Sequence, residues 1–430
     1  TPGLLVEWLV RERVVEAIFG EGMHDQMVRR CVEVLCFLAM RGALDSRLLE
    51  LIWRSSLDKH ASVRQAIYLV LIDLTGHLPP PLIDQLYDHI RSVPYAEYTP
   101  HTVVLLRGFS VAALQAAAAS SANSAASPPP KPRQWYGLHE LWELMQSEAP
   151  VSDELRSMGG NVLSDLLGWA TCAGRRAEFL ERCVDRLRVG ESVPQALRLC
   201  QRIVASFPGK PRKKGDSVFT VLAWLEERHQ LTAVIFADID RYHAAARRRL
   251  EAIRSGGACG AAAAGAEADA SASSALSQPV TEHLAQVAER LDFLSFCITH
   301  GAFSLTRGQM DVLWDCCVVN AASPLEADRL FRWLETARLK AGDALDAETT
   351  RHLFARASEL QPELLSTSAY SCIEITIYIV SRRLLLMTAL ALFTGGAGGG
   401  RAGPSLYLPS CTFPVPSLNL PSGGAGGGRA

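Results

Sequence analysis

The sequence contains no uninterrupted apolar run long enough to cross a lipid bilayer. Its most hydrophobic segment, Ile373 to Phe393, is broken by Ser381, Arg382 and Arg383. The stretch that remains, Leu384 to Phe393, is too short for a hydrocarbon core of about 30 Å. We therefore predict no transmembrane helix and no membrane partner.

The sequence also lacks an excess of charge of either sign. Its 43 lysine and arginine residues and 45 aspartate and glutamate residues give a formal net charge of −2. This balance supplies no long-range field that would concentrate DNA, RNA or an anionic membrane near the protein. Two basic segments occur, Lys210 to Lys214 in a loop and Arg247 to Arg249 on an expected helix. We interpret the first as an ordinary solvated loop, with a nuclear-import signal or a contact with an acidic partner as the alternatives. We predict no nucleic-acid partner.

The signatures of nucleotide hydrolysis and of zinc proteases are incomplete. A phosphate-binding loop needs Ser or Thr after Gly209-Lys210, but Pro211 stands there. The segment that begins at His139 has Glu143 where an HExxH helix carries its second histidine. We therefore predict no cofactor and no metal site, and we assign no catalytic residue.

The 11 cysteines have no spacing typical of a disulfide framework or a zinc site. Cys31, Cys36, Cys183, Cys200 and Cys297 fall among apolar residues at helical spacing, which is typical of reduced core thiols in an intracellular protein. A thiolate nucleophile would instead need a low pKa and access to substrate. A hidden Cys/His enzyme site stays open as an alternative, because such partners meet in space and not in sequence.

The apolar residues of the first quarter of the chain recur every three or four positions, and strand-like alternation is nearly absent. Two of the stripes that result are Met27, Val28, Cys31, Val34, Leu35 and Leu38, and Val63, Ile67, Val70, Leu71 and Leu74. Asp45 is placed to cap the start of one helix, and Thr99-Pro100 marks the start of another. These patterns predict an all-α protein.

The expected helices follow one another at the pitch of a repeat array. Those near His24 and His60 are separated by about one tetratricopeptide, HEAT or armadillo unit of roughly 34–47 residues. No clean consensus recurs at this period, which favours an irregular armadillo-like or HEAT-like superhelix. Seven tryptophans, spread about one to a helix, are interpreted as packing anchors. They are Trp8, Trp53, Trp142, Trp169, Trp224, Trp314 and Trp333.

Composition divides the chain into helical blocks and segments too small and polar to bury a face. The helical blocks are residues 1–114, 134–254 and 279–374, the two disordered linkers are 115–133 and 255–278, and the low-complexity tail is 375–430. Within the tail, GGAGGGRA occurs twice around a proline-rich segment that cannot form a core. We hypothesise that a mis-annotated intron or a frame change after Glu374 produced the tail, and that the chain beginning at Thr1 is an internal fragment.

The segment from Glu7 to Leu74 contains, in order, Ile18-Phe19-Gly20 followed by His24, Phe37-Leu38-Ala39, Leu51-Ile52-Trp53 and Lys59-His60. In these features the segment resembles the helical region that precedes the catalytic domain of fat-facets-type ubiquitin-specific proteases. Later matches are Phe179 to Cys183, Ser192 to Leu197, Leu305 to Trp314, Leu330 to Glu335, Leu360 to Leu365 and Ala369 to Glu374. The resemblance covers most of the chain from Leu4 to Glu374 apart from the two linkers.

The resemblance implies that the parent protein is a ubiquitin carboxyl-terminal hydrolase, a cysteine-type deubiquitinase whose thiolate attacks the isopeptide bond. Such proteases carry a GLxNxGNTCYxN cysteine box and a downstream histidine box, and neither occurs in these 430 residues. The chain itself is therefore expected to be a non-catalytic scaffold that recruits ubiquitinated substrates or adaptors, or positions the catalytic domain. A cytoplasmic location follows, with access to the nucleus if the basic segment acts as an import signal. The alternative is an armadillo/HEAT-type adaptor with no protease domain.

Overall fold

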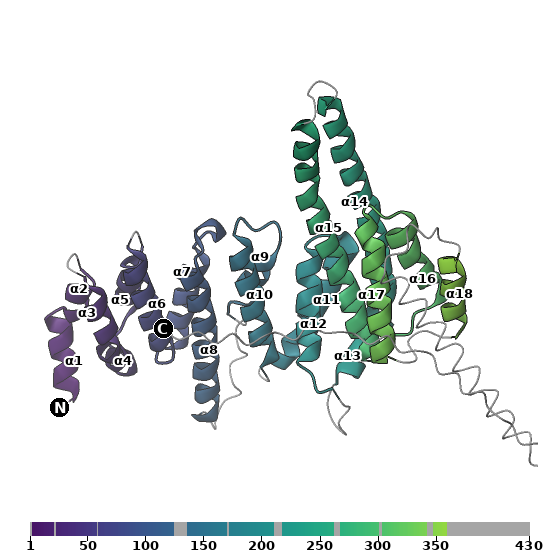
Figure 1. The fold of residues 1–430 in the computed structure, drawn as a ribbon. Helices are drawn as coiled ribbons and strands as arrows, with labels where there is room; N and C mark the ends of the chain where they lie inside the picture. Colours follow the sequence, from purple (N-terminus) through teal and green to yellow (C-terminus); the bar gives the residue numbers. More distant parts are fainter. Residues whose placement is uncertain are drawn as a thin grey trace, which may run out of the picture. The chain divides into compact units, whose positions relative to one another are not determined.

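A computed structural model describes residues 2–20, 23–57, 59–123, 136–169, 172–209, 217–261, 267–300, 303–341 and 347–358 (Figure 1). All regular elements within these ranges are helices, and none is a β-strand. The prediction of an all-α protein is thus confirmed. The chain divides into two compact units, Thr1–Thr376 and Ile377–Ala430. The second unit and the predicted tail, residues 375–430, lie outside the described residues.

The helices of the first part of the chain are short, apart from the last. They are α1 (Pro2–Arg11), α2 (Val14–Ile18), α3 (Asp25–Arg30), α4 (Val32–Met40), α5 (Ser46–Arg54), α6 (Ala61–Thr75), α7 (Pro80–Arg91), the 3₁₀ turn η1 (Tyr95–Glu97) and α8 (Pro100–Asn123).

The second part contains two long helices, α14 and α15, among shorter ones. Its elements are α9 (Leu138–Met145), α10 (Asp153–Gly168), α11 (Ala173–Val189), α12 (Val193–Ala205), α13 (Val218–His229), α14 (Leu231–Ala261), α15 (Glu267–Thr299), α16 (Arg307–Trp314), the π-helical turn η3 (Asp315–Val319), α17 (Pro324–Ala341) and α18 (Ala347–Ser358).

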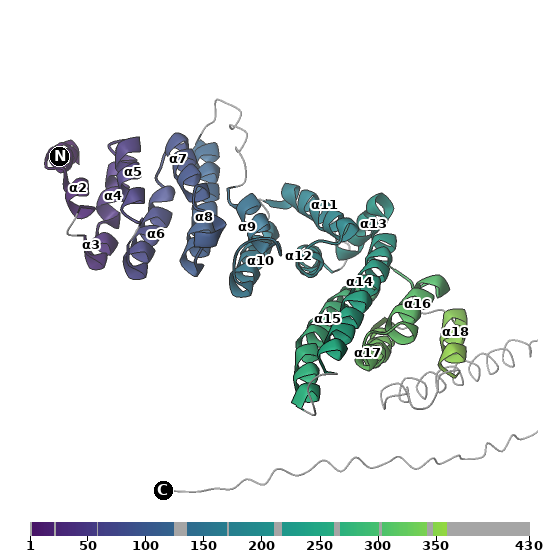
Figure 2. The same cartoon turned by 90° about the horizontal axis from the view of Figure 1, so that it is seen from above.

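Each helix packs mainly on helices that are close to it in the sequence. Helix α5 packs on α7, α6 on α8, α8 on α10, α10 on α12, α12 on α15 and α15 on α17. Figure 2 shows the helices from α1 to α8 lying side by side in chain order. Such nearest-neighbour packing is the defining property of a helical repeat array, in which each unit completes its core on the next one.

The expected helix starts are present. The carboxylate of Asp45 accepts a hydrogen bond of 2.8 Å from the backbone N–H of Leu48, which has no partner within the first turn of α5. Helix α8 begins at Pro100, as the sequence predicts, because proline at the first helical position removes no intrahelical hydrogen bond. Gly42, which lies between α4 and α5, has φ +68°, a conformation that glycine adopts without strain.

Most residues of the two predicted apolar stripes are buried, Val34 and Val63 are partly buried, and Met27 is exposed. Val28, Leu35, Ile67 and Leu71 are fully enclosed. Met27 is wrongly assigned to the first stripe, because half of its surface is exposed. A turn at Cys31 divides that segment into α3 and α4, and this break rotates Met27 away from the buried face.

The tryptophans do not all anchor the core as predicted. Trp53, Trp142, Trp314 and Trp333 are buried, and Trp224 is partly buried, but Trp8 is 48% exposed and Trp169 is 37% exposed. The prediction is therefore wrong for these last two. Trp8 lies on α1, whose one buried residue is Leu9, and Trp169 is the residue that follows the last turn of α10.

Helices extend into both segments for which the sequence predicts linkers. Helix α8 continues to Asn123, α14 continues to Ala261, and α15 begins at Glu267 with Pro279 inside it. The physical reason is the alanine content of these segments, because alanine has the highest intrinsic helix propensity even where it buries nothing. Residues 124–133 of the first predicted linker and 262–266 of the second lie outside the described residues.

Candidate functional site: grooves beside helix α15

The residues that could suggest a protease have structural roles. Nδ1 of His139 lies 3.9 Å from Oε1 of Glu143, one turn along α9. Glu140, between them in the sequence, is buried and accepts a hydrogen bond of 2.6 Å from the Tyr87 hydroxyl on α7. Its other carboxylate oxygen lies 3.1 Å from Nε of Arg91. This half-matched zinc motif therefore connects α9 to α7.

The cysteines within the described residues resemble core thiols more than nucleophiles. Cys31, Cys183, Cys200 and Cys297 are buried, while Cys36 is partly exposed. Burial raises the pKa of Cys31 to about 11 and that of Cys200 to about 12, because the interior disfavours the charged thiolate. The pKa of Cys183 and that of Cys297 are raised well above the ordinary value for the same reason.

The two basic segments differ in what the structure describes. The first, Lys210 to Lys214, lies outside the described residues. In the second, Arg247 donates a hydrogen bond of 2.7 Å to Asn320, and Arg248 donates to the Ala244 carbonyl. Arg249 lines a groove described below.

Three neighbouring grooves lie along helix α15. The α10–α12 groove has a volume of about 400 Å³ and is lined by Asp153, Arg156, Asn161, Arg198 and Arg202. Arg156 is paired with Asp153, whereas Arg202 contacts the uncharged Asn161. The charged side chains of this groove are therefore mainly positive.

The α12–α14 groove, of about 440 Å³, adjoins the first, because Pro194, Gln195 and Gln286 line both. Arg249 and Glu282 bring opposite charges to its rim. The groove is therefore an extension of the first along α12, with a more balanced charge.

The α15–α17 groove is the largest, at about 720 Å³, and contains the aromatic side chains of Phe296 and Trp333. Nη2 of Arg198 donates a hydrogen bond of 2.6 Å to Oε1 of Glu289, which joins the wall of the α10–α12 groove to this one. Arg332 completes the far side. Aromatic and arginine side chains in a concave surface are the residue types that dominate protein–protein contacts.

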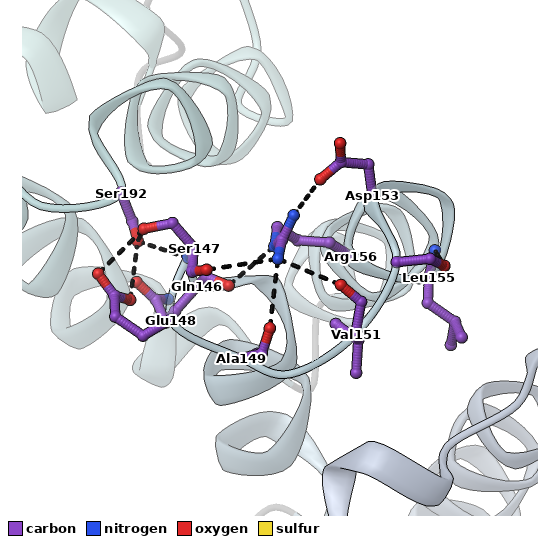
Figure 3. A network of polar contacts seen from close by, with 10 residues as sticks. Gln146, Ser147, Glu148, Ala149, Val151, Asp153, Leu155, Arg156 and Ser192 are labelled. Carbon is purple, nitrogen blue, oxygen red and sulfur yellow. Dashed lines mark hydrogen bonds and ion pairs between the residues drawn. The ribbon is translucent and has the colours of Figure 1, made fainter.

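A network of polar contacts fixes the loops that border these grooves (Figure 3). The guanidinium group of Arg156 donates hydrogen bonds to backbone carbonyls of the α9–α10 loop, at 2.9 Å to Gln146, 3.3 Å to Ala149 and 3.3 Å to Val151. In the next loop along, the Ser192 hydroxyl accepts a hydrogen bond of 2.8 Å from the Ser147 N–H. The two loops are thus held together before any partner binds.

Sequence reasoning missed one cluster altogether. His243, His283 and Glu326 lie on three different helices and are all buried, and their ligand atoms lie within 4.8 Å of one another. They are some 40 residues apart in the sequence and match no spacing motif, so the only sequence signal is a histidine on the apolar face of each long helix. The sequence analysis did not single out this group, whose chemistry is considered below.

Of the helices in the described ranges, none combines the length and the hydrophobicity needed to span a bilayer.

Comparison with known families identifies the repeat. The family described as the UBP24/USP9X/USP9Y ARM repeat matches residues 1–99 and 138–379. The unmatched residues 100–137 contain the whole of α8 and the first predicted linker. The match ends at residue 379, close to Glu374, after which the resemblance is predicted to stop.

Individual relatives point the same way. The chain is 22% identical to the probable ubiquitin carboxyl-terminal hydrolase FAF of Drosophila melanogaster, over 87% of this chain and 13% of that protein. It is 21% identical to the ubiquitin carboxyl-terminal hydrolase 9X of Mus musculus, over 86% of this chain and 14% of the relative. A shorter match, 28% identical over 53% of this chain and 6% of the relative, is to the human ubiquitin carboxyl-terminal hydrolase 34. The chain thus spans only a small part of the length of these relatives.

Proposed function

The chain belongs to the UBP24/USP9X/USP9Y ARM-repeat family, and from this premise we propose that it is a non-catalytic scaffold segment of a ubiquitin carboxyl-terminal hydrolase. Its role in that protein is to recruit ubiquitinated substrates or adaptors, or to position the catalytic domain. The observation that carries the proposal is the run of three neighbouring grooves beside α15.

The chemistry of the grooves indicates the kind of partner. Arg202 contacts the uncharged Asn161, and Arg249 extends the positive charge into the next groove. Extended protein segments bind the surfaces of helical repeats without needing a single deep pocket. We infer a partner segment that carries acidic side chains toward α12 and aromatic or aliphatic side chains toward Trp333 in the α15–α17 groove.

The test is quantitative capture of proteins from a cell extract on the immobilised chain. The variant Arg202→Glu/Arg249→Glu reverses two exposed charges in the grooves, and the matched control Arg29→Glu/Arg30→Glu reverses two exposed charges on α3. We expect capture of the specific partners to fall about tenfold in the groove variant and to be unchanged in the control. Equal capture by all three proteins would contradict the proposed surface.

The alternative function is an armadillo-type adaptor without a protease domain. It would use the same grooves. The two functions differ in what the remainder of the gene encodes, which the transcript reveals. The two functions also predict different enzymatic behaviour of the full-length protein. In a deubiquitinase, substitutions in the grooves should slow the removal of ubiquitin from captured substrates and leave the cleavage of a small ubiquitin derivative unchanged.

A further inference from the structure

Three helices that are separate in the sequence each bring one buried ionisable side chain to a common point. These are His243 on α14, His283 on α15 and Glu326 at the start of α17, with side chains 6%, 3% and 0% exposed. Nδ1 of His243 lies 3.3 Å from Oε2 of Glu326, and Nε2 of His283 lies 2.9 Å from Oε1. One nitrogen of each imidazole therefore faces the same carboxylate.

The contacts within this cluster are short, but two of its atoms are not aligned for hydrogen bonding. Among the described residues, neither Nε2 of His283 nor Oε2 of Glu326 has a hydrogen-bond partner. Buried polar atoms are almost always satisfied. Nε2 of His89 is unsatisfied in the same way beside Glu50, so what distinguishes His283 and Glu326 is a third potential ligand, His243, beside them. A cation bound between them would satisfy both.

The outward nitrogens of the two imidazoles have partners of their own. Nδ1 of His283 lies 2.9 Å from the Tyr242 hydroxyl, and Nε2 of His243 lies 3.8 Å from the Cys317 sulfur. In metal sites, the nitrogen that does not bind the ion is usually held by such a contact, which fixes the tautomer and the ring orientation. Both histidines therefore present a fixed inward nitrogen.

The carboxylate is also fixed in place. Glu326 is the third residue of α17, and its Oε1 accepts a hydrogen bond of 2.8 Å from the N–H of Ser323, the residue before the helix. Both carboxylate oxygens therefore have defined positions, with Oε1 2.9 Å from Nε2 of His283 and Oε2 3.3 Å from Nδ1 of His243.

The nearest buried cation does not compete for this carboxylate. Arg290 lies over the Tyr242 ring, but its Nε donates a hydrogen bond of 2.8 Å to Asp238. An ion also has a route to the cluster, because His283 and Tyr242 line the α12–α14 groove.

We propose that His243, His283 and Glu326 bind one Zn²⁺ ion that ties α14, α15 and α17 together. Two imidazoles and a carboxylate are a donor set that suits zinc, with bonds of about 2.0–2.2 Å and room for a water molecule in the fourth position. Tetrahedral bonds of that length place ligand atoms about 3.3 Å apart, so small side-chain movements close the present spacing. Burial excludes a substrate, and the ion therefore has a structural role.

The test uses the full chain, without an affinity tag that could bind metal. After treatment with a chelator and dialysis, the protein is incubated with Zn²⁺, freed of excess ion and analysed for bound metal by mass spectrometry. We expect about one Zn²⁺ per chain and a rise in melting temperature of about 5 °C when Zn²⁺ is restored to the metal-free protein. Because this comparison uses the wild-type chain, it does not depend on whether a variant folds.

Variants then assign the ion to these residues. His283→Gln and Glu326→Gln preserve side-chain volume and should each lose the bound Zn²⁺ and the thermal shift, while their circular dichroism shows that the helices persist. The control His89→Gln alters a histidine that also contacts a carboxylate, at 2.8 Å from Glu50, but has no third potential ligand within the described ranges. This variant should bind Zn²⁺ as the wild type does. Absence of both metal and thermal shift in the wild type, or zinc binding that survives both variants, would overturn the proposal.

Discussion

The hydroxyl of Ser192 lies 2.7 Å from the hydroxyl of Ser147, and this contact joins the loop before α12 to the loop before α10. Ser192 also donates to Oε2 of Glu148 at 3.1 Å and is held at φ +48°, a left-handed conformation that serine rarely adopts. Several polar contacts thus offset local backbone strain at the edge of the α12–α14 groove.

Ser192→Ala should lower the free energy of unfolding by about 1–2 kcal/mol, because it leaves the Ser147 N–H without its acceptor. Urea denaturation followed by circular dichroism measures the change. The control is Ser92→Ala, which removes a hydroxyl that bonds only to a carbonyl of its own helix and should change stability far less. Equal effects of the two substitutions would show that the contact between the loops contributes nothing.

Two glycines on neighbouring helices should respond to alanine in opposite directions. A Cβ atom at Gly108 on α8 would lie 2.6 Å from Cδ1 of Ile72 on α6, so Gly108→Ala should destabilise the protein by about 1–3 kcal/mol. At Gly160 on α10 the nearest atom is 3.9 Å away, in Met145, and alanine should add about 0.5–1 kcal/mol through its helix propensity. Thermal unfolding of both variants tests the close packing of α6 and α8. A higher melting temperature for Gly108→Ala would contradict that packing.

The buried thiols should resist alkylation at neutral pH. Cys183 and Cys297 are enclosed, and burial raises their pKa, so little thiolate is available to react. Peptide mapping after brief iodoacetamide treatment should find these two positions unlabelled in the native chain and labelled after denaturation. Rapid labelling of either one in the native state would instead support the Cys/His enzyme alternative.

The attachment of α18 to α16 should weaken in acid. Asp311 contacts Nε2 of His352 at 2.7 Å and Nη1 of Arg356 at 2.8 Å, and the hydrogen bond from His352, followed by that from Arg356, lowers the pKa of Asp311. Because the pKa of Asp311 is lower in the folded chain than in the unfolded chain, where it is about 3.9, its contacts contribute their full stability above that pH. This contribution is lost as the pH falls through the pKa of the folded chain. Amide exchange of α18 should therefore accelerate below about pH 4. Asp311→Asn should exchange fast already at neutral pH, and an unchanged acid response in that variant would exclude this contact as the cause.

The fold was largely predictable because the information that specifies a repeat array is local. The cap at Asp45 and the proline at the start of α8 are set by neighbours within four residues, and the stripe of Ile67 and Leu71 follows from helical geometry alone. The prediction was wrong at Met27, where a one-residue break changes which face is buried. Trp8 and Trp169 are exposed because their burial depends on whether another helix covers them, which local pattern does not specify.

The functional surfaces could not be predicted in the same way. The ion pair between Arg198 and Glu289 joins α12 to α15, and the cluster of His243, His283 and Glu326 joins three helices. Such groups depend on how distant helices pack, and no spacing in the sequence encodes that arrangement. Only the role of Glu326 as a helix cap, three residues after Ser323, has a local signature.

The most direct test of the central claim, that this segment is the scaffold of a deubiquitinase, is to sequence the transcript through codon 374 and onward to its stop codon. The account predicts that the true reading frame continues into further helical repeats and then into a GNTCY-type cysteine box and a histidine box. A frame that leads to no such boxes would contradict it, and the grooves beside α15 would then belong to an adaptor without a protease.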